Sequence, residues 1–528
     1  MKPCPVLIAG QWRAPASTRT FQSENPATRQ LLPDVYPVST WADADAALTA
    51  AVEAARSLTK LPSETIARFL DRFAAGIEAR AADLVAMANA ETGLPVKPRL
   101  ADGELPRTTN QLRQAAAAAR EGSWQHATID VKANIRSSFG PIGPVCVFGP
   151  NNFPFAFNSI AGGDFAAALA AGNSVIAKAN SSHPGTTRLL AEIAQQMVEE
   201  TGLPAGTVQL LYRLEHADGE RLVADARTGA TAYTGSRSAG LALKAAADRA
   251  GKPIYLELSS INPVVVLPGA LRERADSIAG EFTTSCLMGA GQFCTNPGLV
   301  LLLAGADTDK FIADLTQRFK AAPVGTLLSA SVAKSLKSGV DKLQSSGAKV
   351  LVGGTTGGGN GHSYANTLLS VPATQFLAQP EALQTEAFGN ASLLVVAETA
   401  EQAAAVLDHL EGNLTGCIYS DTNGSDDAFY DQLAPRLRQR VGRLLNDKMP
   451  TGVAVSPAMN HGGPYPATGH PGFTAVGIPA SLARFGMLQC YDNVRPHRLP
   501  AVLRDKSPNG RIWRSIDGIW TQSDVTSS

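Results

Sequence analysis

The 528-residue sequence lacks an excess of charge of either sign. It contains 46 Lys and Arg residues and 46 Asp and Glu residues, which gives a net charge of zero. Without a basic surplus, the chain has little general attraction for nucleic acid or an anionic membrane, so we expect neither as a partner. Hydrophobic residues make up 44% of the chain and charged residues 17%, which is typical of a globular protein.

Cysteine is scarce and is not arranged in pairs. The six cysteines are Cys4, Cys146, Cys286, Cys294, Cys417 and Cys490. The eight-residue spacing of Cys286 and Cys294 fits no common zinc pattern, so we expect no metal centre. Reduced thiols in a cytoplasm are the simplest interpretation.

Long apolar runs are absent as well. The first ten residues lack an apolar core of signal-peptide length, and Asp164 and Asn173 interrupt the least polar stretch, residues 161–177. We therefore expect a cytoplasmic protein with no membrane span. A chain of 528 residues also exceeds one ordinary core, which predicts two or more domains.

Strands and helices alternate through most of the chain. Residues 42–90 and 105–120 have helical patterns, and residues 131–137 alternate as a strand does. From residue 145 onward, short apolar strands alternate with helices, which predicts an α/β fold with parallel sheets covered on both faces. The expected strands are 145–148, 174–178, 208–212, 230–233, 254–258, 264–267, 299–303, 349–352 and 393–396.

One cysteine has the surroundings of a nucleophile. Cys294 lies in the segment Gly291-Gln292-Phe293-Cys294-Thr295-Asn296-Pro297-Gly298, whose glycines and proline predict an irregular loop. A thiol on a loop can be exposed and reactive. Taken alone, Cys294 is better explained as a small buried apolar residue.

Two segments could bind an anion. Lys178 ends a strand and is followed by Ser181 and His183, and the carboxyl end of a parallel strand is a common phosphate site. Gly235 and Ser236 join a strand to the start of a helix, where free N–H groups attract anions. A solvated loop and an ordinary strand–helix connection explain the same patterns.

Two polar residues follow apolar strands. Glu257 ends the strand 254–258, where burial could tune it as a general base, or where an ion pair could hold it. Asn152 follows the strand 145–148 and could donate to an oxyanion, although asparagine is also common in turns.

Together these motifs resemble the aldehyde dehydrogenase superfamily over about residues 5 to 490. The matching segments are Pro150-Asn151-Asn152-Phe153-Pro154, Lys178, Gly235-Ser236 with Gly240, Leu256-Glu257-Leu258, Gly291-Gln292-Phe293-Cys294 and Glu386-Ala387-Phe388-Gly389. Each motif is weak alone, but six motifs in the family's order are specific. They favour the interpretation of Cys294 as a nucleophile over that of a buried apolar residue.

The resemblance implies a covalent mechanism. Cys294 would attack an aldehyde to form a thiohemiacetal, whose oxyanion the Asn152 side chain and the Cys294 N–H would hold. Hydride transfer to a nicotinamide would leave a thioester, and Glu257 would activate the water that hydrolyses it.

The resemblance also implies a cofactor site. Glu386 would bind the nicotinamide ribose with Phe388 beside it, and Gly235 and Ser236 would meet the pyrophosphate. Lys178 would bind the adenosine ribose, and Gly240 belongs to the same motif as Gly235.

The sequence departs from the family at several positions. Ser259 and Ser260 stand where many relatives have two glycines, and Asn390 stands where proline usually follows Phe-Gly. Ser181 stands where NAD-preferring relatives often have glutamate, whose carboxylate repels a 2′-phosphate. We therefore expect NADP as the preferred cofactor, with NAD possible, and with Lys178, Ser181 and His183 near the phosphate.

Within the superfamily the chain is most similar to the NADP-linked 2-oxoglutarate semialdehyde (2,5-dioxopentanoate) dehydrogenases, and next to NADP-linked fatty aldehyde enzymes. The segments that carry this similarity are 291–298, His461-Gly462-Gly463-Pro464-Tyr465-Pro466-Ala467 and Arg495-Pro496-His497-Arg498-Leu499-Pro500. An oxo-acid needs cations or donors for its carboxylate, whereas a fatty aldehyde needs an apolar tunnel. Arg107, Gln111 and Arg113, on a helix where the family lines its tunnel, are the candidate anchors, and a solvated helix surface is the alternative.

The family architecture implies two parallel-sheet α/β domains and a small β bridge for oligomerisation. We assign residues 1–122 and 143–259 to cofactor binding, 260–465 to catalysis, and 123–142 and 487–528 to the bridge and tail. A homodimer or homotetramer is expected. Two other classes remain open: a coenzyme A-acylating transferase and a non-catalytic binding protein on this fold.

Overall fold

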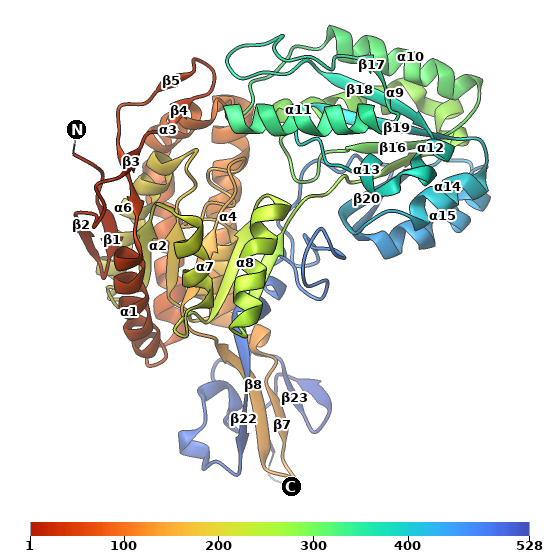
Figure 1. Ribbon diagram of the computed structural model, residues 1–528. Helices are drawn as coiled ribbons and strands as arrows, with labels where there is room; N and C mark the ends of the chain where they lie inside the picture. The colour runs from red at the N-terminus through yellow and green to blue at the C-terminus, as the bar shows by residue number, and fades with distance from the viewer. Residues whose placement is uncertain (1, 527–528) are drawn as a thin grey trace.

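The computed structural model describes residues 2–526, so Met1, Ser527 and Ser528, which end the first and last of the predicted domain segments, lie outside the described residues. The chain forms two α/β bodies, each built on a seven-stranded sheet, and an arm that projects below them (Figure 1). The predicted α/β fold with two parallel-sheet units is confirmed.

The first sheet has the strand order β14-β13-β9-β10-β11-β1-β2. Five strands are parallel: β14 (Ile254–Glu257), β13 (Ala230–Thr234), β9 (Val145–Phe148), β10 (Val175–Lys178) and β11 (Val208–Leu211). The antiparallel strands β1 (Val6–Ile8) and β2 (Gln11–Arg13) complete the edge. The chain runs from β9 to β10 on one side and later returns to β13 on the other. A ligand crevice is therefore expected at the carboxyl end of β9.

Helices cover this sheet, and all residues of β9 and β11 are buried. The helices are α1 (Trp41–Leu58), α2 (Ser63–Ala79), α3 (Ala81–Thr92), α4 (Leu105–Glu121), α5 (Gly163–Ala170), α6 (Pro184–Thr201), α7 (His216–Ala224) and α8 (Arg237–Arg249). Beside them lie two small sheets, β12 (Arg213–Leu214) with β6 (Tyr36–Ser39) and β3 (Thr20–Phe21), and β4 (Glu24–Asn25) with β5 (Gln30–Leu31).

The second sheet has the order β17-β18-β19-β16-β15-β20-β21. Its strands are β17 (Lys349–Val352), β18 (Thr367–Pro372), β19 (Ala391–Ala397), β16 (Leu299–Leu303), β15 (Val264–Val266), β20 (Asn413–Tyr419) and β21 (Val441–Asn446), and only β17 is antiparallel to its neighbour. Its helices are α9 (Pro268–Leu287), α10 (Ala306–Ala321), α11 (Ala330–Ser345), α12 (Ala373–Ala378), α13 (Pro380–Leu383), α14 (Ala400–Asp408) and α15 (Asp427–Arg440).

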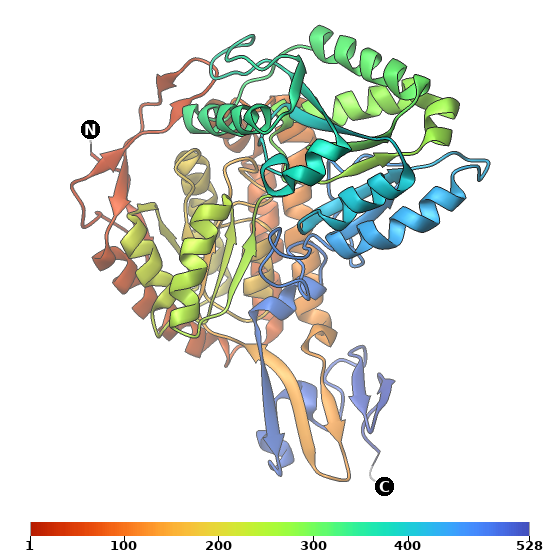
Figure 2. The ribbon, with the colours of Figure 1, turned by 45° about the vertical axis from the view of Figure 1, so that its right-hand side comes forward.

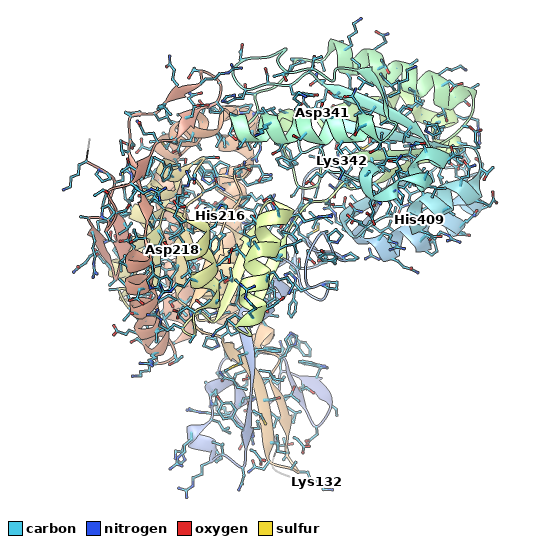
Figure 3. The ribbon with its side chains drawn as sticks, viewed as in Figure 1. Lys132, His216, Asp218, Asp341, Lys342 and His409 are labelled. Carbon is cyan, nitrogen blue, oxygen red and sulfur yellow. The ribbon has the colours of Figure 1, made fainter. Side chains whose placement is uncertain are left out.

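The arm is a separate five-stranded sheet, which Figure 2 shows from a second side. Its order is β22 (Gly486–Asp492), β8 (Ile135–Pro141), β7 (Thr128–Asp130), β23 (Arg514–Ile516) and β24 (Ile519–Thr521). Lys132, labelled in Figure 3, lies at its far tip. The arm therefore joins residues from two segments that are far apart in the sequence.

The predicted strand 131–137 is partly wrong. Residues 131–134 form the turn between β7 and β8, and the strand begins at Ile135. The Ala133 N–H donates to the Asp130 Oδ1 over 2.8 Å, and Asn134 has a φ of 54°, which asparagine tolerates better than most residues. These local bonds override the alternating pattern.

The assigned domain limits stay a prediction. The strands of the first sheet fall within residues 1–122 and 143–259, and those of the second within 260–465. Residues 466–486, which the prediction left unassigned, include the short helix η4 (Ala480–Phe485) beside α5. Within residues 2–526, no helix combines the length and apolar character needed to cross a membrane.

Candidate active site

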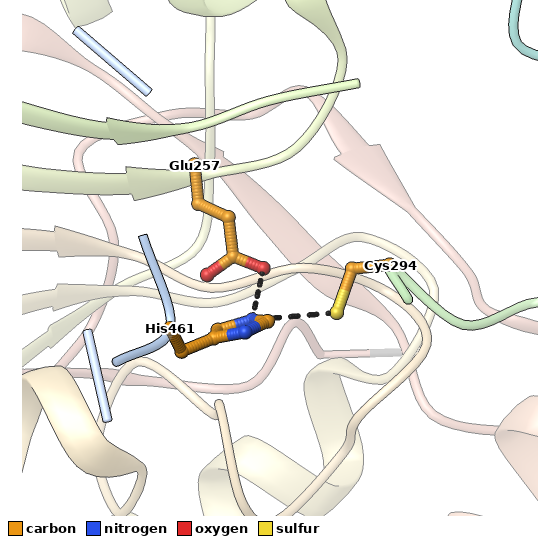
Figure 4. A group of neighbouring side chains, drawn as sticks. All are labelled: Glu257, Cys294 and His461. Atoms are coloured by element: carbon orange, nitrogen blue, oxygen red, sulfur yellow. Dashed lines mark hydrogen bonds and ion pairs between the residues drawn. The ribbon is translucent and has the colours of Figure 1, made fainter. Parts of the chain in front are cut away.

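Three reactive side chains meet where the two α/β bodies face each other. Glu257 ends β14, Cys294 follows the short helix η3 (Met288–Gly291), and His461 lies on the loop after β21 (Figure 4). The His461 Nε2 lies 3.5 Å from the Cys294 Sγ and 2.8 Å from the Glu257 Oε1. One imidazole nitrogen therefore faces both a thiol and a carboxylate.

The loop that carries Cys294 is fixed by its backbone. Gly291 has a φ of 68°, and a Cβ there would lie 2.1 Å from the Gly389 carbonyl oxygen, so only glycine fits. The Asn262 side chain donates to the Cys294 carbonyl over 2.9 Å. The half-buried Cys294 lines a cavity of about 650 Å³.

The charges of the cluster oppose an ionised thiol. Burial, reinforced by the nearby Glu257 carboxylate, raises the pKa of Cys294 well above its usual value. Burial also disfavours the charged Glu257, but the charge and hydrogen bond of His461 outweigh it and hold the pKa of Glu257 below its ordinary value. Cys294 is therefore a thiol beside a carboxylate.

Asn152 lies at the same cavity. It follows β9 at the crevice where the strand order reverses, is 5% exposed and lines the cavity together with Cys294. Its amide donates to the Gln292 carbonyl over 2.9 Å, and Arg99 donates to its backbone carbonyl over 3.0 Å. These contacts hold an amide N–H group close to the Cys294 loop.

A second cavity of about 740 Å³ continues from the first. The two share residues of the loop after β9 and of the β13–α8 turn, among them Gly235 and Ser236. Lys178 and Ser181 line the second cavity, and Glu386 and Phe388 line the first. The cleft thus runs along the carboxyl ends of the first sheet and ends at Cys294.

The far end of the cleft carries two cationic side chains, and Glu215 and Glu220 line the same cavity. Lys178 and Arg213, from the carboxyl end of β10 and from β12, line it together with Ser181. Burial and the charge of Arg213 lower the pKa of Lys178 to about 8. His216, labelled in Figure 3 at the start of α7, lines the same end. Two cationic side chains held close together favour an anionic group between them.

Glu386 faces the other half of the cleft. Its Oε1 accepts a hydrogen bond of 3.3 Å from the Ser260 N–H. Burial raises the pKa of Glu386 to about 7, and hydrogen bonds from Ser259 and Ser260 limit that rise. The two serines that replace the family's glycines therefore contact a predicted cofactor ligand.

Three predicted positions lie deeper in the structure. His183 is buried, and its ring nitrogens face the Pro150 carbonyl at 2.9 Å and the Thr187 hydroxyl at 3.4 Å, so the structure does not bring its side chain to the cleft. Gly240 is buried in α8, where a Cβ would lie 2.4 Å from Leu258. Asn390 donates to the Tyr364 carbonyl and to the Asn366 side chain, which stabilises the loop before β19.

The three candidate substrate anchors separate into two groups. The Arg107 guanidinium lies 5.8 Å from the Phe153 ring and 5.2 Å from the Phe157 ring, and its Nε donates to Gln111 over 3.3 Å. Arg113 instead forms a bidentate surface ion pair with Glu78, at 2.6 and 2.7 Å. Arg107 and Gln111 thus lie at an aromatic cluster beside Cys294, whereas Arg113 has a partner elsewhere.

Sequence reasoning did not assign His461 or Arg213 a role. His461 lies in a segment that is similar to relatives, but nothing local marks a histidine before two glycines as a partner of Cys294. Arg213 falls in a two-residue strand, and only the fold brings it to Lys178.

Comparisons with known proteins identify relatives of the whole chain. The model of the Aldehyde dehydrogenase family matches residues 12–461. Alpha-ketoglutaric semialdehyde dehydrogenase 2 from Azospirillum brasilense is 38% identical over 514 residues, covering 95% of this chain and 97% of that protein. Alpha-ketoglutaric semialdehyde dehydrogenase from Acinetobacter baylyi is 35% identical and covers 98% of each chain. Among solved structures, a betaine aldehyde dehydrogenase from Staphylococcus aureus in complex with NAD⁺ matches with a TM-score of 0.80 and 20% identity, covering 93% of this chain and 95% of that one.

Proposed function

The chain belongs to the aldehyde dehydrogenase family, and from this premise we propose that it oxidises 2-oxoglutarate semialdehyde (2,5-dioxopentanoate) to 2-oxoglutarate with NADP. The observation that carries the substrate assignment is Arg107. Its Nη2 is buried and has no hydrogen-bond partner among the described residues. A buried guanidinium N–H group without a partner, here beside Cys294, is costly unless a ligand accepts its hydrogen bond.

The roles of the catalytic residues follow from their positions. The Cys294 thiol loses its proton to solvent, and the His461 Nε2, 3.5 Å from the Cys294 Sγ, donates to the Glu257 Oε1 over 2.8 Å and so holds the carboxylate beside the sulfur. The Cys294 sulfur attacks the aldehyde carbon, and the Asn152 amide donates to the oxyanion. Glu257 then removes a proton from the water that hydrolyses the thioester.

The cleft fits a nicotinamide dinucleotide. Lys178, Ser181 and Arg213 would hold the adenosine ribose and its phosphate, Gly235 and Ser236 the pyrophosphate, and Glu386 and Phe388 the nicotinamide ribose. When bound, the nicotinamide supplies the acceptor for the hydride that leaves the thiohemiacetal. The paired cations and the serine at position 181 support a preference for NADP, whose 2′-phosphate they would contact.

The substrate carboxylate is the proposed partner of Arg107. Gln111 accepts a hydrogen bond from the Arg107 Nε, and its own amide donates to the Ala156 carbonyl over 3.1 Å. The guanidinium is therefore held with its Nη2 free for a ligand. Burial lowers the pKa of Arg107, and the surrounding negative charge of Glu104 opposes this. The names of the relatives from Azospirillum brasilense and Acinetobacter baylyi support the same substrate.

A medium- or long-chain fatty aldehyde is the second candidate. The apolar cluster of Phe153, Ala156, Phe157, Phe293 and Val476 lies beside the Cys294 loop and favours an apolar chain. A coenzyme A-acylating transferase is less well supported, because Glu257 provides a base for hydrolysis.

We also propose a cytoplasmic homodimer or homotetramer, and the arm supports the assembly. Exposed apolar side chains gather on it, with Leu488 61% and Ile519 70% exposed, and Trp513 and Trp520 also exposed. An apolar surface of this kind favours burial against another copy. Sedimentation of the purified protein tests the assembly.

A panel of aldehydes assayed with NADP and with NAD tests the proposed function. We expect the highest kcat/KM for 2-oxoglutarate semialdehyde with NADP, and product analysis should give the free acid whether or not coenzyme A is present. A higher kcat/KM for decanal would favour the fatty aldehyde, and a coenzyme A thioester as product would reject hydrolysis.

A further inference from the structure

We propose that Cys294, His461 and Glu257 form an inhibitory site for a thiophilic divalent cation such as Zn²⁺ or Cd²⁺. The three side chains each offer one ligand atom, and these atoms lie within 4.8 Å of one another. Thiolate, imidazole and carboxylate are the ligands that zinc uses in proteins, and three of them leave a fourth position for water. The expectation that the protein has no resident metal is unaffected, because the proposed ion is exchangeable.

The spacing fits a tetrahedral ion. Zinc lies about 2.3 Å from sulfur and about 2.0 Å from nitrogen, and a tetrahedral angle between them places the two atoms about 3.5 Å apart. The Cys294 Sγ and the His461 Nε2 are 3.5 Å apart. The same construction separates nitrogen from oxygen by about 3.3 Å, so the Glu257 carboxylate would give up the 2.8 Å contact of its Oε1 with His461 and turn Oε2 toward the ion.

An unsatisfied atom also points to a ligand. The Glu257 Oε2 is buried and has no hydrogen-bond partner in the part of the chain that the structure describes. A buried carboxylate oxygen of this kind gains a partner when a cation binds. The other Glu257 oxygen is the one that contacts His461.

The three ligands come from separate segments that the backbone holds in place. Leu258, next to Glu257, donates its N–H to the Ala467 carbonyl over 2.8 Å. The His461 N–H donates to the Thr474 hydroxyl over 2.8 Å. With Asn262 fixing the Cys294 carbonyl, little movement is needed to assemble the site, which favours tight binding.

Binding needs no redox step. The metal–sulfur bond forms as the Cys294 thiol releases its proton to solvent. The proton that His461 Nε2 directs at Glu257 moves to Nδ1 or to solvent, which frees the Nε2 lone pair, and the carboxylate oxygen donates an existing one. Hard cations such as Mg²⁺ and Ca²⁺ prefer oxygen ligands and should not compete. Metal binding does not depend on the proposed function. Inhibition of turnover does, because the metal would occupy the sulfur lone pair that attacks the aldehyde.

The test measures binding to the reduced, metal-free apoprotein without substrate. A Cys490→Ser background removes the exposed thiol. We expect Co²⁺ to give a sulfur-to-metal charge-transfer band and the intense visible bands of tetrahedral coordination, and Zn²⁺ to displace it at one ion per chain. Zn²⁺ should also protect Cys294 from iodoacetamide, as measured by peptide mass spectrometry.

Substitutions separate a three-ligand site from capture by a thiol alone. His461→Gln and Glu257→Gln should each weaken Zn²⁺ binding at least about tenfold, as the loss of a supporting contact does in metal sites. Cys417 is a buried thiol outside the cluster, so Cys417→Ser should leave Zn²⁺ binding unchanged. Zn²⁺ binding that is unchanged in both variants would overturn the proposal, as would a weak octahedral cobalt spectrum in the Cys490→Ser protein. The second result does not depend on whether the ligand variants fold.

Discussion

Arg107→Met tests the substrate assignment most sharply. The substitution keeps the length and apolar character of the stem but removes the guanidinium that lies over Phe153 and Phe157. No ion pair of the protein is broken, since the Arg107 Nε donates only to the neutral Gln111 and its Nη2 has no partner among the described residues. The loss therefore falls on the ligand that pairs with the guanidinium.

The size of the effect follows from the local dielectric. The Coulomb attraction between the guanidinium and a carboxylate about 4 Å away is about 4 kcal/mol at an effective dielectric constant of about 20. The net contribution of a hydrogen bond to a charged group is smaller, about 1.5–3 kcal/mol, because both partners lose hydrogen bonds to water when they meet. A loss of about 2–4 kcal/mol corresponds to a decrease in kcat/KM of about 30- to 700-fold.

The assay compares two substrates and two variants. Arg107→Met should lower kcat/KM for 2-oxoglutarate semialdehyde by this factor. The kcat/KM for 4-oxopentanal, which keeps the five-carbon chain and the ketone but has a methyl group in place of the carboxylate, should stay nearly unchanged. Arg113→Met is the matched control on α4, because Arg113 pairs with Glu78 at the surface and both side chains are 44% exposed. Equal losses for both substrates, or the same selectivity in Arg113→Met, would refute the reasoning.

Three further predictions concern the cofactor and the thiol. Ser181→Glu should lower kcat/KM for NADP by about 10- to 100-fold and spare NAD, because the new carboxylate repels a 2′-phosphate, and Arg213→Ala should act in the same direction. Since the pKa of Glu386 is raised to about 7, the cofactor KM should rise as pH falls below about 7, where the protonated carboxyl accepts fewer ribose hydrogen bonds, and Glu386→Gln should flatten this profile. Because burial and Glu257 raise the pKa of Cys294, its alkylation by iodoacetamide in the apoprotein should keep increasing above pH of about 8.5, where an ordinary thiol levels off.

Each of these has a clear contrary result. Equal losses for NAD and NADP in Ser181→Glu would indicate a general disturbance of the cleft. A cofactor KM that is flat from pH 6 to 8 would mean that Glu386 does not titrate there or does not contact the ribose. Alkylation of Cys294 that is already maximal at pH 7 would show a thiolate, contrary to the burial argument.

Much of the fold was predictable because its signals are local. The strand at residues 145–148 is a run of apolar residues bounded by glycine and proline, and the structure has β9 at those residues. The turn at residues 131–134 was missed, because its hydrogen bond to Asp130 uses a side chain that the alternating pattern does not reveal. Pairing of β7 and β8 with strands more than 340 residues away also leaves no local trace.

The site was predictable only where a motif marks it. Cys294 and Glu257 belong to recognisable segments. His461 contacts both side chains, but it lies on the loop that follows β21, and no motif marks it. His183 shows the opposite case, since a histidine two residues after Ser181 was expected at the phosphate and is instead buried against Pro150. Sequence spacing gives the segment, whereas the direction of a side chain depends on tertiary contacts.

The most direct test of the account is to trap the acyl group on Cys294. Glu257→Gln, mixed with 2-oxoglutarate semialdehyde and NADP, should release about one NADPH per active site in a burst and then turn over about 10²- to 10⁴-fold more slowly than the unmodified enzyme. Intact and peptide mass spectrometry should find the thioester on Cys294. A burst without an adduct on Cys294, or full turnover in Cys294→Ser, would contradict the covalent mechanism on which every assignment above depends.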